Sequence, residues 1–310
     1  MTPMNIDEWN SDLLWGKARM FMARALSDER EGPLFGFWSV LSLELLARSS
    51  LAAVHPALLA DPREPENLLA AFGFRTTGRS PISIPAKALF ARCAVVVPGF
   101  TSEDATFCQR LAVLRNEELH AGTAAFADYP TGQWLGDFYR VAKVLLDSVN
   151  RDLTAFLGSD SEASAADELI TATLARIETT VKESIAAHRR GWEAAGSMPG
   201  TFAVPSSIDG PYVKQAPCPA CRSTAQLSGD VISIADPRVV EDGIERVVVV
   251  QPTRLFCRVC ALTITGLPPL YAADHDLASP FSVTMFETPE DFYGIDTHPT
   301  PDYEYEYENE

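Results

Sequence analysis

The six residues from Arg115 to His120 place a guanidinium, an amide and an imidazole within one short stretch of chain. A neutral imidazole can accept a proton from a ribose 2′-OH, and an imidazolium can donate one to the departing 5′-oxygen. A guanidinium stabilises the additional negative charge of the phosphate in the transition state. These residue types suit phosphodiester cleavage that requires no metal, with Asn116 orienting the imidazole or the substrate. They also have a structural interpretation, because cations near a helix C-terminus complement the helix dipole.

The spacing of these residues suggests that one copy of the chain is not enough. On a helix, Asn116 and His120 lie within about 40° of each other, whereas Arg115 lies about 140° from His120. One helix would therefore present an open site. Two copies that meet across a dimer axis would bring two histidines and two arginines around one cleft. The interpretation favours a homodimer.

Helical spacing runs through the first 195 residues and predicts the elements that hold this segment. Thr101 to Asp104 has the form of a helix start, and Gly122 lies where that helix should end. Further helices are expected from Asp7, over 33–52, near 66–72 and 86–95, over 134–158, and from 161 to the cationic cluster at 188–190. The prediction is an antiparallel helical bundle.

The segment Leu114 to Gly122 resembles the signature of the HEPN superfamily, in which Arg-Asn opens a six-residue window closed by His and followed soon by Gly. Leu43 to Arg48 is similar to the glutamate-plus-basic pattern of an early HEPN helix, and the likeness covers residues 7 to 192. The resemblance implies a helical dimer that acts as a metal-independent endoribonuclease, as a toxin or an anti-phage defence effector. It makes Arg115 and His120 the catalytic pair and Asn116 the supporting residue.

Four further residues are candidates for substrate binding. Glu44 and Arg48 are carried over from the resemblance, although a carboxylate paired with an arginine one turn later is also an ordinary structural pair. Arg189 and Arg190 end a predicted helix and could hold a phosphate near the cleft. The alternative for both is a solvated helix end that complements the dipole.

Two Cys-x-x-Cys pairs, separated by 35 residues, indicate a metal centre. The four residues are Cys218, Cys221, Cys257 and Cys260. Four thiolates at the ends of adjacent strands match tetrahedral zinc and resemble a zinc ribbon. A site with four cysteine ligands leaves no open coordination position, so the expected role of Zn²⁺ is structural. The alternative is that basic residues around the pairs contact RNA or a partner protein, namely Lys214, Arg222, Arg254 and Arg258.

The formal charge of −17 disfavours nucleic acid at first sight, because phosphate binding needs basic surface. Nine acidic residues and no Lys or Arg follow Phe286, so much of this charge lies in a tail rich in Tyr and Glu. A disordered, solubilising end is expected there. The sharper hypothesis is that the tail imitates a nucleic acid and closes the groove, so that truncation after Met285 would raise activity.

The predicted fold class is α+β, with a helical HEPN-like domain (1–195), a linker (196–212), a small β-rich zinc-ribbon domain (213–285) and an acidic tail (286–310). The longest apolar stretch is interrupted by Glu44 and Arg48, and the N-terminus lacks the pattern of a signal peptide. A cytoplasmic location without membrane contact is therefore expected.

Two functions follow from the sequence. The first is an endoribonuclease that acts by 2′-OH attack and leaves a 2′,3′-cyclic phosphate, with RNA as its substrate and a regulatory or sensor protein as an additional partner. The second is a non-catalytic HEPN-like scaffold that binds a nucleotide or a partner, with the zinc ribbon as a docking surface. The acidity of the chain favours the second, and the RNEELH segment favours the first.

Overall fold

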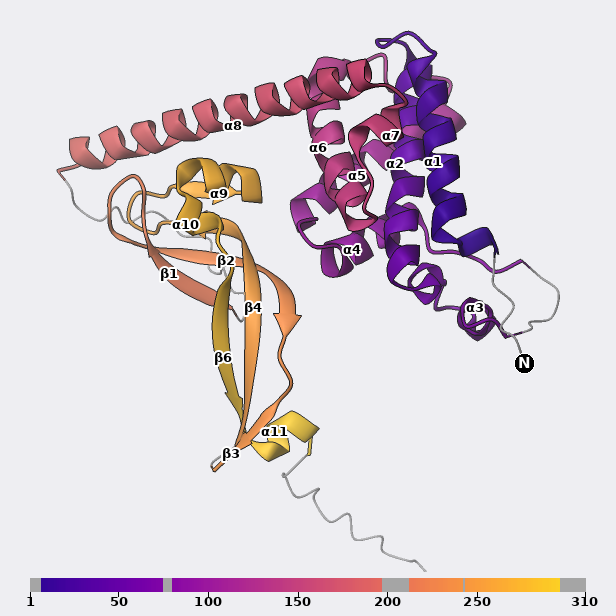
Figure 1. Cartoon of the computed structure of the whole chain (residues 1–310). Helices are drawn as coiled ribbons and strands as arrows, with labels where there is room; N and C mark the ends of the chain where they lie inside the picture. The colour runs from indigo at the N-terminus through magenta and orange to yellow at the C-terminus, as the bar shows by residue number, and fades with distance from the viewer. Residues whose placement is uncertain (1–6, 75–79, 197–211, 242, 296–310) are drawn as a thin grey trace, which may run out of the picture.

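The computed structural model describes residues 7–74, 80–196, 212–241 and 243–295 as a helical N-terminal region followed by a curled sheet (Figure 1). The first region contains α1 (Ser11–Leu26), α2 (Pro33–Val54), α3 (Pro65–Ala71), α4 (Ala86–Val96), α5 (Ser102–His120), α6 (Leu135–Ser148), α7 (Leu153–Leu157) and α8 (Asp160–Ala194). The mixed fold class is thus as predicted.

The helix α2 is the central element of the helical region and contacts α1, α4, α5 and α6. Its side chains Phe35, Leu43, Leu46 and Leu51 are fully buried. By length and composition α2 could also cross a membrane, but 56% of its apolar window is buried inside the protein. Its apolar character is accounted for by the core that it supplies.

The helix α5 has both of its ends near the predicted positions. Thr101 Oγ1 accepts from the Asp104 amide, and Asp104 Oδ2 accepts from the Thr101 amide at 3.0 Å, which forms a capping box. Arg140 of α6 donates to Asp104 Oδ1 at 2.7 Å and ties this helix start to the core. The helix ends at His120, shortly before Gly122.

Two predicted helix boundaries are wrong. The expected helix over 134–158 is two helices, because Asn150 adopts a left-handed conformation (φ 53°) and Asp152 caps α7 by accepting from the Ala155 amide at 2.7 Å. Asn tolerates this conformation, and an Asp cap competes with continuation of the helix. At the N-terminus, α1 begins at Ser11 behind the Asn10 cap rather than at Asp7.

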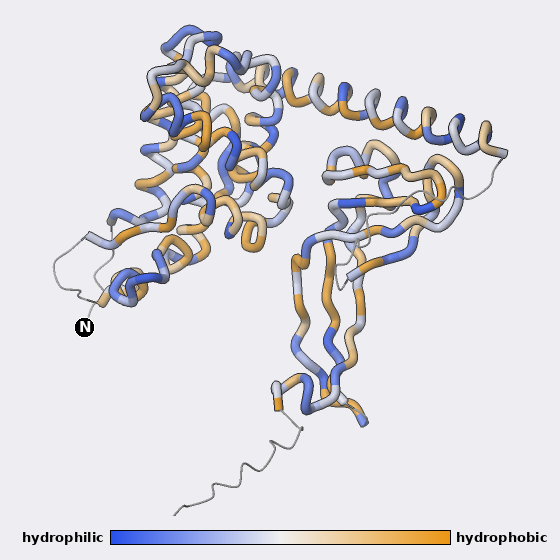
Figure 2. The backbone as a smooth tube through the Cα atoms, turned by 180° about the vertical axis from the view of Figure 1, so that it is seen from behind, coloured by the Kyte–Doolittle hydropathy of each residue, from blue (hydrophilic) through white to orange (hydrophobic). Residues whose placement is uncertain are grey.

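The long helix α8 belongs to both hydrophobic cores. Ala166 and Ile170 pack into the core of the helical region, whereas Ile177, Val181 and Ile185 pack against the core of the sheet region. Figure 2 shows apolar positions recurring along the whole of α8. The division between the two cores therefore falls within α8, not at the predicted boundary after residue 195. Most of the predicted linker lies outside the described residues.

The sheet is antiparallel and is organised around β4 (Gly243–Phe256), which pairs with β2 (Thr224–Ile234), β3 (Arg238–Val240), β5 (Thr263–Thr265) and β6 (Phe281–Glu287). The strand β1 (Val213–Pro217) pairs with β2. The β-branched runs at 231–234 and 247–250 lie in β2 and β4, as predicted. Two short helices, α9 (Leu267–Ala273) and α10 (His275–Ala278), follow β5, and α9 contacts α8.

The start of the predicted acidic tail is structured, so that boundary is also wrong. Residues 286–287 complete β6, and α11 (Pro289–Tyr293) follows. Arg246 of β4 forms an ion pair with Glu287 at 2.6 Å, and its guanidinium lies 5.4 Å from the centre of the Phe292 ring. A truncation after Met285 would cut through β6, so a test of the tail hypothesis has to begin after Ile295. Residues 296–310 lie outside the described residues.

Candidate functional site

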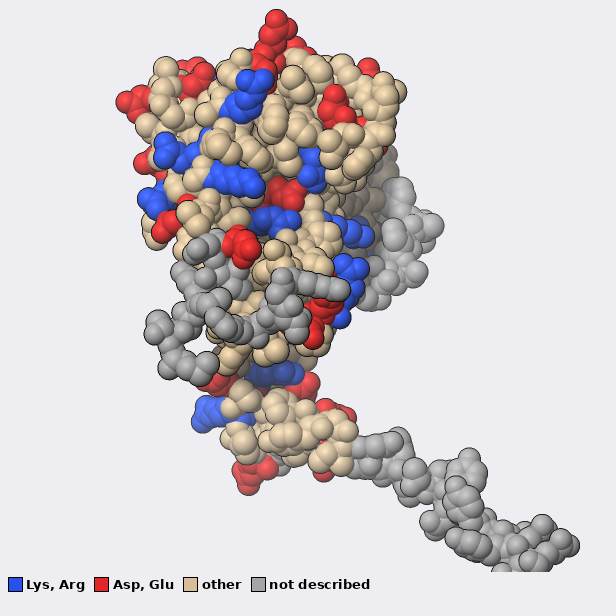
Figure 3. Space-filling model, turned by 90° about the vertical axis from the view of Figure 1, so that its right-hand side faces the viewer, with Lys and Arg blue, Asp and Glu red and all other residues tan. Residues whose placement is uncertain are grey.

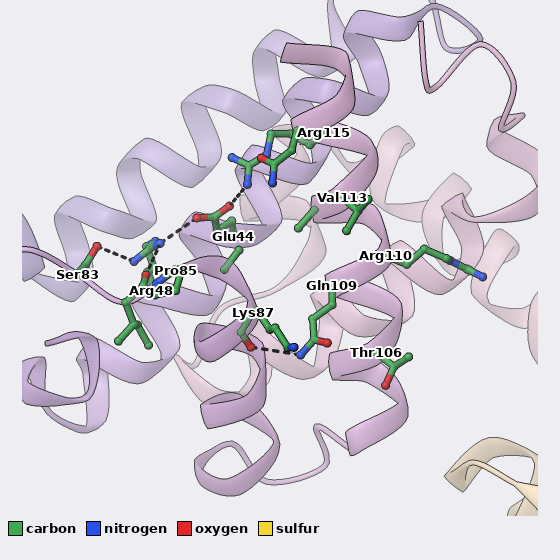
Figure 4. Close-up of a pocket in the computed structure, with 14 residues that line it drawn as sticks. Glu44, Arg48, Ser83, Pro85, Lys87, Thr106, Gln109, Arg110, Val113 and Arg115 are labelled. Atoms are coloured by element: carbon green, nitrogen blue, oxygen red, sulfur yellow. Dashed lines mark hydrogen bonds and ion pairs between the residues drawn. The ribbon is translucent and has the colours of Figure 1, made fainter. Parts of the chain in front are cut away.

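The motif helix α5 lines an open hollow of about 780 Å³ together with α2, the segment 83–85 and the start of α4 (Figure 4). Its lining residues are Glu44, Arg48, Ser83, Ile84, Pro85, Ala86, Lys87, Thr106, Gln109, Arg110, Ala112, Val113, Arg115 and Asn116. The hollow thus brings together Glu44, Arg48, Arg115 and Asn116, four of the residues that the sequence singled out.

Glu44 joins two arginines on one side of this hollow. Arg48 Nη2 lies 2.9 Å from Glu44 Oε1, and Arg115 Nη2 lies 3.0 Å from Glu44 Oε2. The side chains are 12% to 14% exposed, so water screens these ion pairs only in part. The pairing of Glu44 with Arg48 is the structural alternative that the sequence left open. The contact with Arg115 adds a role in positioning the motif arginine.

The two arginines differ in how fully their donors are used. Arg48 also donates to Ser83 Oγ at 3.0 Å and to the Ile84 carbonyl at 3.1 Å, which ties α2 to the segment before α4. The buried Nε of Arg115 has no hydrogen-bond acceptor among the described residues. Arg48 is therefore mainly structural in its contacts, whereas Arg115 keeps one N–H that is not used within the described residues, next to Glu44 Oε2, which also lacks a hydrogen-bond partner there.

His120 lies outside the hollow but on the same side of α5. It is exposed at the last position of the helix and is not among the lining residues. At about 100° per residue, Gln109, Val113, Asn116 and His120 fall within about 60° of one another. His120 therefore extends the exposed stripe one turn beyond the hollow. A single copy unites Arg115 with Asn116 but leaves the histidine at the rim.

Arg189 and Arg190 lie elsewhere, on the part of α8 that packs against the sheet region. Arg189 donates to the carbonyls of Pro219 and Ala220 at 3.0 and 3.3 Å. Neither arginine lines the hollow, so their position does not fit a phosphate contact beside Arg115 within one copy. The amphipathic pattern of α8 did not indicate which of the two cores its final turns contact.

The four cysteines that the sequence paired are brought together at one end of the sheet. Their sulfur atoms all lie within 4.8 Å of one another and are buried. The Cys218 and Cys260 sulfurs are 3.6 Å apart, and those of Cys221 and Cys257 are 3.5 Å apart. These separations are far from the ~2.05 Å of a disulfide and close to the ~3.8 Å edge of a tetrahedron with metal–sulfur bonds of ~2.3 Å.

Both cysteine pairs sit in turns of the same construction. The amide of Cys218 donates to the Ser223 carbonyl at 2.8 Å, and the amide of Cys257 donates to the Leu262 carbonyl at 2.9 Å. Each bond spans the same number of residues at the tip of a hairpin, β1–β2 in one case and β4–β5 in the other. The two turns therefore present their sulfurs to a common point.

The backbone of these turns repeats as well. Arg222 and Ala261, each one position after the second cysteine of its pair, both have positive φ, at 65° and 59°. A non-glycine residue in this region is uncommon and is retained where the surroundings require it. The donor set and its geometry fit a four-coordinate metal ion such as zinc.

Burial raises the pKa of the Cys218 thiol to about 11. A thiol in this state keeps its proton near neutral pH unless a cation displaces it. At Cys221, burial is outweighed by hydrogen bonds with Ser223 and the neighbouring cysteines, which lower the pKa of that thiol to about 7. Metal binding to the cluster therefore releases protons and weakens as the pH falls.

The sequence did not reveal Lys87 or Arg110 as neighbours of the motif. Arg110 precedes Val113 by three residues, so the helical repeat places these two side chains next to each other on α5. Lys87 reaches the hollow only because α4 packs against α5, and this contact depends on tertiary structure.

Comparison of the chain with protein-family models, with curated proteins and with solved structures finds no match, so the resemblance to the HEPN superfamily rests on the sequence pattern alone.

Proposed function

We propose that this chain is an endoribonuclease of HEPN type that cleaves RNA without a catalytic metal ion, at a site shared by two copies. The observation that carries the proposal is the placement of Arg115 beside Asn116 in the hollow, held by Glu44, with His120 on the same stripe of α5. A fixed guanidinium in the hollow and a solvent-accessible imidazole one turn further along α5 are the two groups that 2′-OH attack requires, and a second copy would bring them together.

In this mechanism, each residue acts on a stated atom. His120 accepts the proton of the 2′-OH, and the imidazolium of a second copy donates a proton to the 5′-oxygen. Arg115 donates to a non-bridging oxygen of the scissile phosphate and stabilises the charge that builds up there in the transition state. The P–O5′ bond breaks as the 2′-oxygen bonds to phosphorus, so the products are a 2′,3′-cyclic phosphate and a 5′-hydroxyl.

The exposed side of α5 supports the requirement for a second copy. Val113 and Leu119 are 54% and 58% exposed, and contact with a second copy would cover apolar surface at these positions. If two copies pair their α5 helices antiparallel about Asn116, symmetry brings His120 of the second copy next to residue 112 of the first. Since Ala112 lines the hollow, this arrangement would complete the site.

We further propose that the four cysteines hold a structural Zn²⁺ in a zinc-ribbon arrangement, and that the protein acts in the cytoplasm, where metal-binding thiols remain reduced. The resemblance of the motif to the HEPN superfamily also supports a role as a toxin or in defence against phage.

The experiment compares His120→Ala with the wild type in cleavage of a labelled single-stranded RNA. Loss of a general base or acid lowers the rate about 10²- to 10⁴-fold. The matched control is His275→Ala, because His275 is also exposed but lies on α10 of the sheet region. A His120→Ala protein that cleaves as fast as the control would refute the proposal.

A second function is favoured by one specific observation. The charge of Arg115 is already compensated by Glu44, as in a structural ion pair, and the chain carries a formal charge of −17. A non-catalytic scaffold that binds a nucleotide or a partner at the hollow would use the same geometry. In that case no variant of His120 changes RNA integrity, whereas ligand binding depends on Arg115.

A further inference from the structure

The hollow is far more basic than the protein that contains it. Among the residues that the structure describes, it is lined by four cationic side chains, Arg48, Lys87, Arg110 and Arg115, against the single carboxylate of Glu44. Since Glu44 can neutralise one guanidinium, the lining keeps a positive excess. Figure 3 shows that basic side chains also occur on the face of the helical region seen there, with acidic side chains between them. An acidic chain that keeps a cationic hollow has a local site for an anion.

The start of α4 adds to this positive potential. Pro85, Ala86 and Lys87 line the hollow, and α4 spans 11 residues. Pro85 occupies the N-cap position without a side-chain hydrogen bond, and the first turn contains no acidic residue. The first amides of a helix have no acceptor within the helix, and the dipole is positive at this end. The free backbone amides at such a terminus can donate hydrogen bonds to a phosphate.

A third observation points to a missing acceptor. Arg115 lines the hollow, and its buried Nε–H has no acceptor among the described residues; Glu44 Oε2, 3.0 Å from Arg115 Nη2, likewise has no hydrogen-bond donor there. A buried donor without a partner is destabilising, and a charge-assisted contact with a phosphate oxygen would satisfy it. The volume of about 780 Å³ lies within the range of ligand sites.

We propose that the hollow binds a backbone phosphate of single-stranded RNA next to the scissile one, through Lys87, the first turn of α4 and the Nε of Arg115. This inference rests on the proposed cleavage reaction in one respect, namely that the bound strand is RNA. The phosphate site itself follows from the charges and donors of the hollow. Lys87 is therefore a substrate-binding residue that determines the path of the RNA.

Lys87 is the appropriate residue to change. It is exposed on α4, whereas Arg48 and Arg115 hold the structure together through Glu44. Arg110 points away from Glu44 in Figure 4 and donates to the Tyr129 hydroxyl at 2.9 Å. Lys87→Glu places an acid in the first turn of α4, where it complements the dipole. Folding should therefore be unharmed while phosphate binding is opposed.

The experiment measures binding of a fluorescent single-stranded oligoribonucleotide by anisotropy at several salt concentrations. All proteins carry His120→Ala, so that the RNA remains intact. Lys87→Glu should weaken binding by about 10-fold or more and lower the salt dependence by about one ion. The matched control is Lys17→Glu, because Lys17 is an exposed helical lysine of α1 outside the hollow. Equal binding by the two charge-reversal proteins would overturn the inference.

A second arm distinguishes the source of the phosphate. Inorganic phosphate and adenosine monophosphate are added as competitors of the oligonucleotide. The RNA assignment predicts that neither competes until its concentration far exceeds that of the oligonucleotide. Equal competition by the mononucleotide would overturn the RNA assignment. Failure of the Lys87 test leaves cleavage by His120 intact, whereas full cleavage by the His120→Ala protein refutes the catalytic proposal without affecting Lys87.

Discussion

At the scale of single residues, Glu44 is the feature that organises the candidate site. It lies on the central helix α2, accepts a hydrogen bond from Arg48 of its own helix and forms an ion pair with Arg115 of the motif helix. The pair with Arg48 could be predicted, because the two residues are one helical turn apart. The contact with Arg115 could not, because it depends on how α2 and α5 pack. The motif therefore identified the functional candidate but not the group that positions it.

The first prediction concerns the stability that Glu44 provides. Glu44→Gln leaves two largely buried guanidinium groups beside each other without a counter-charge. Breaking a buried ion pair costs about 3–5 kcal/mol, and the partial exposure of these side chains reduces the expected loss to about 2 kcal/mol. Urea denaturation measures the free energy of unfolding. The control is Glu168→Gln, which removes an exposed carboxylate of α8. A loss no larger than that of the control would contradict the bridging role.

At the scale of elements, α8 connects the two cores and contacts the cysteine centre. His188 Nδ1 lies 2.8 Å from the Cys260 carbonyl, and Arg189 donates to the carbonyls of Pro219 and Ala220. One turn of α8 therefore holds both cysteine turns. The apolar spacing predicted the helix but not this contact, since a stripe of apolar residues does not identify the surface that it covers.

The second prediction is that metal occupancy stabilises the docking of α8. Without a metal, no ion links the two cysteine turns. The carbonyl groups that contact His188 and Arg189 are then no longer held in place. A strong thiol-competing chelator should accelerate tryptic cleavage after Arg189 and Arg190 about 10-fold or more. Cleavage after Lys17 and Arg19, in the helical region, is the internal control. An unchanged rate at the α8 sites after metal removal would show that docking does not depend on the metal.

The predictable and unpredictable parts of the fold differ in the range of the interactions that determine them. Capping at Thr101, the β-branched strand at 247–250 and the cysteine turns are local patterns, and each was found. The expected helix over 134–158 is interrupted at Asn150, because the local cap at this point competes with continuation of the helix. The order of residues 286–295 depends on contacts with β4, for example the ion pair of Arg246 with Glu287. Charge alone predicted disorder there.

At the scale of the whole molecule, the start of α5 contacts the sheet region directly. The Ser102 amide donates to Asp230 Oδ2 of β2 at 3.3 Å. Burial raises the pKa of the neighbouring Glu103 carboxyl, and the nearby charge of Asp230 adds to this effect. The two regions therefore meet at a point where the carboxylates of Glu103 and Asp230 lie near each other, at the start of the helix that carries Arg115 and His120 near its end.

The third prediction follows from this contact. A carboxyl whose pKa is raised on folding binds more protons in the folded state, so stability is lost as the pH rises through the pKa of the unfolded state toward that of the folded one. Glu103→Gln should therefore raise the melting temperature by about 1–3 °C at about pH 7 and have little effect at about pH 4. Thermal denaturation at the two pH values measures the difference, with Glu168→Gln as control. A lower melting temperature for Glu103→Gln near neutral pH would contradict the burial of this charge.

The central claim is that Arg115 and His120 cleave RNA by attack of its own 2′-OH. The most direct measurement is single-turnover cleavage of matched strands that differ at one position, a ribonucleotide in one and its 2′-deoxy analogue in the other, with mass spectrometry of the ends. The account predicts cleavage of the ribonucleotide strand alone, a 2′,3′-cyclic phosphate product, and loss of this product in the His120→Ala protein. Equal cleavage of the 2′-deoxy linkage, or an unchanged product from His120→Ala, would contradict it.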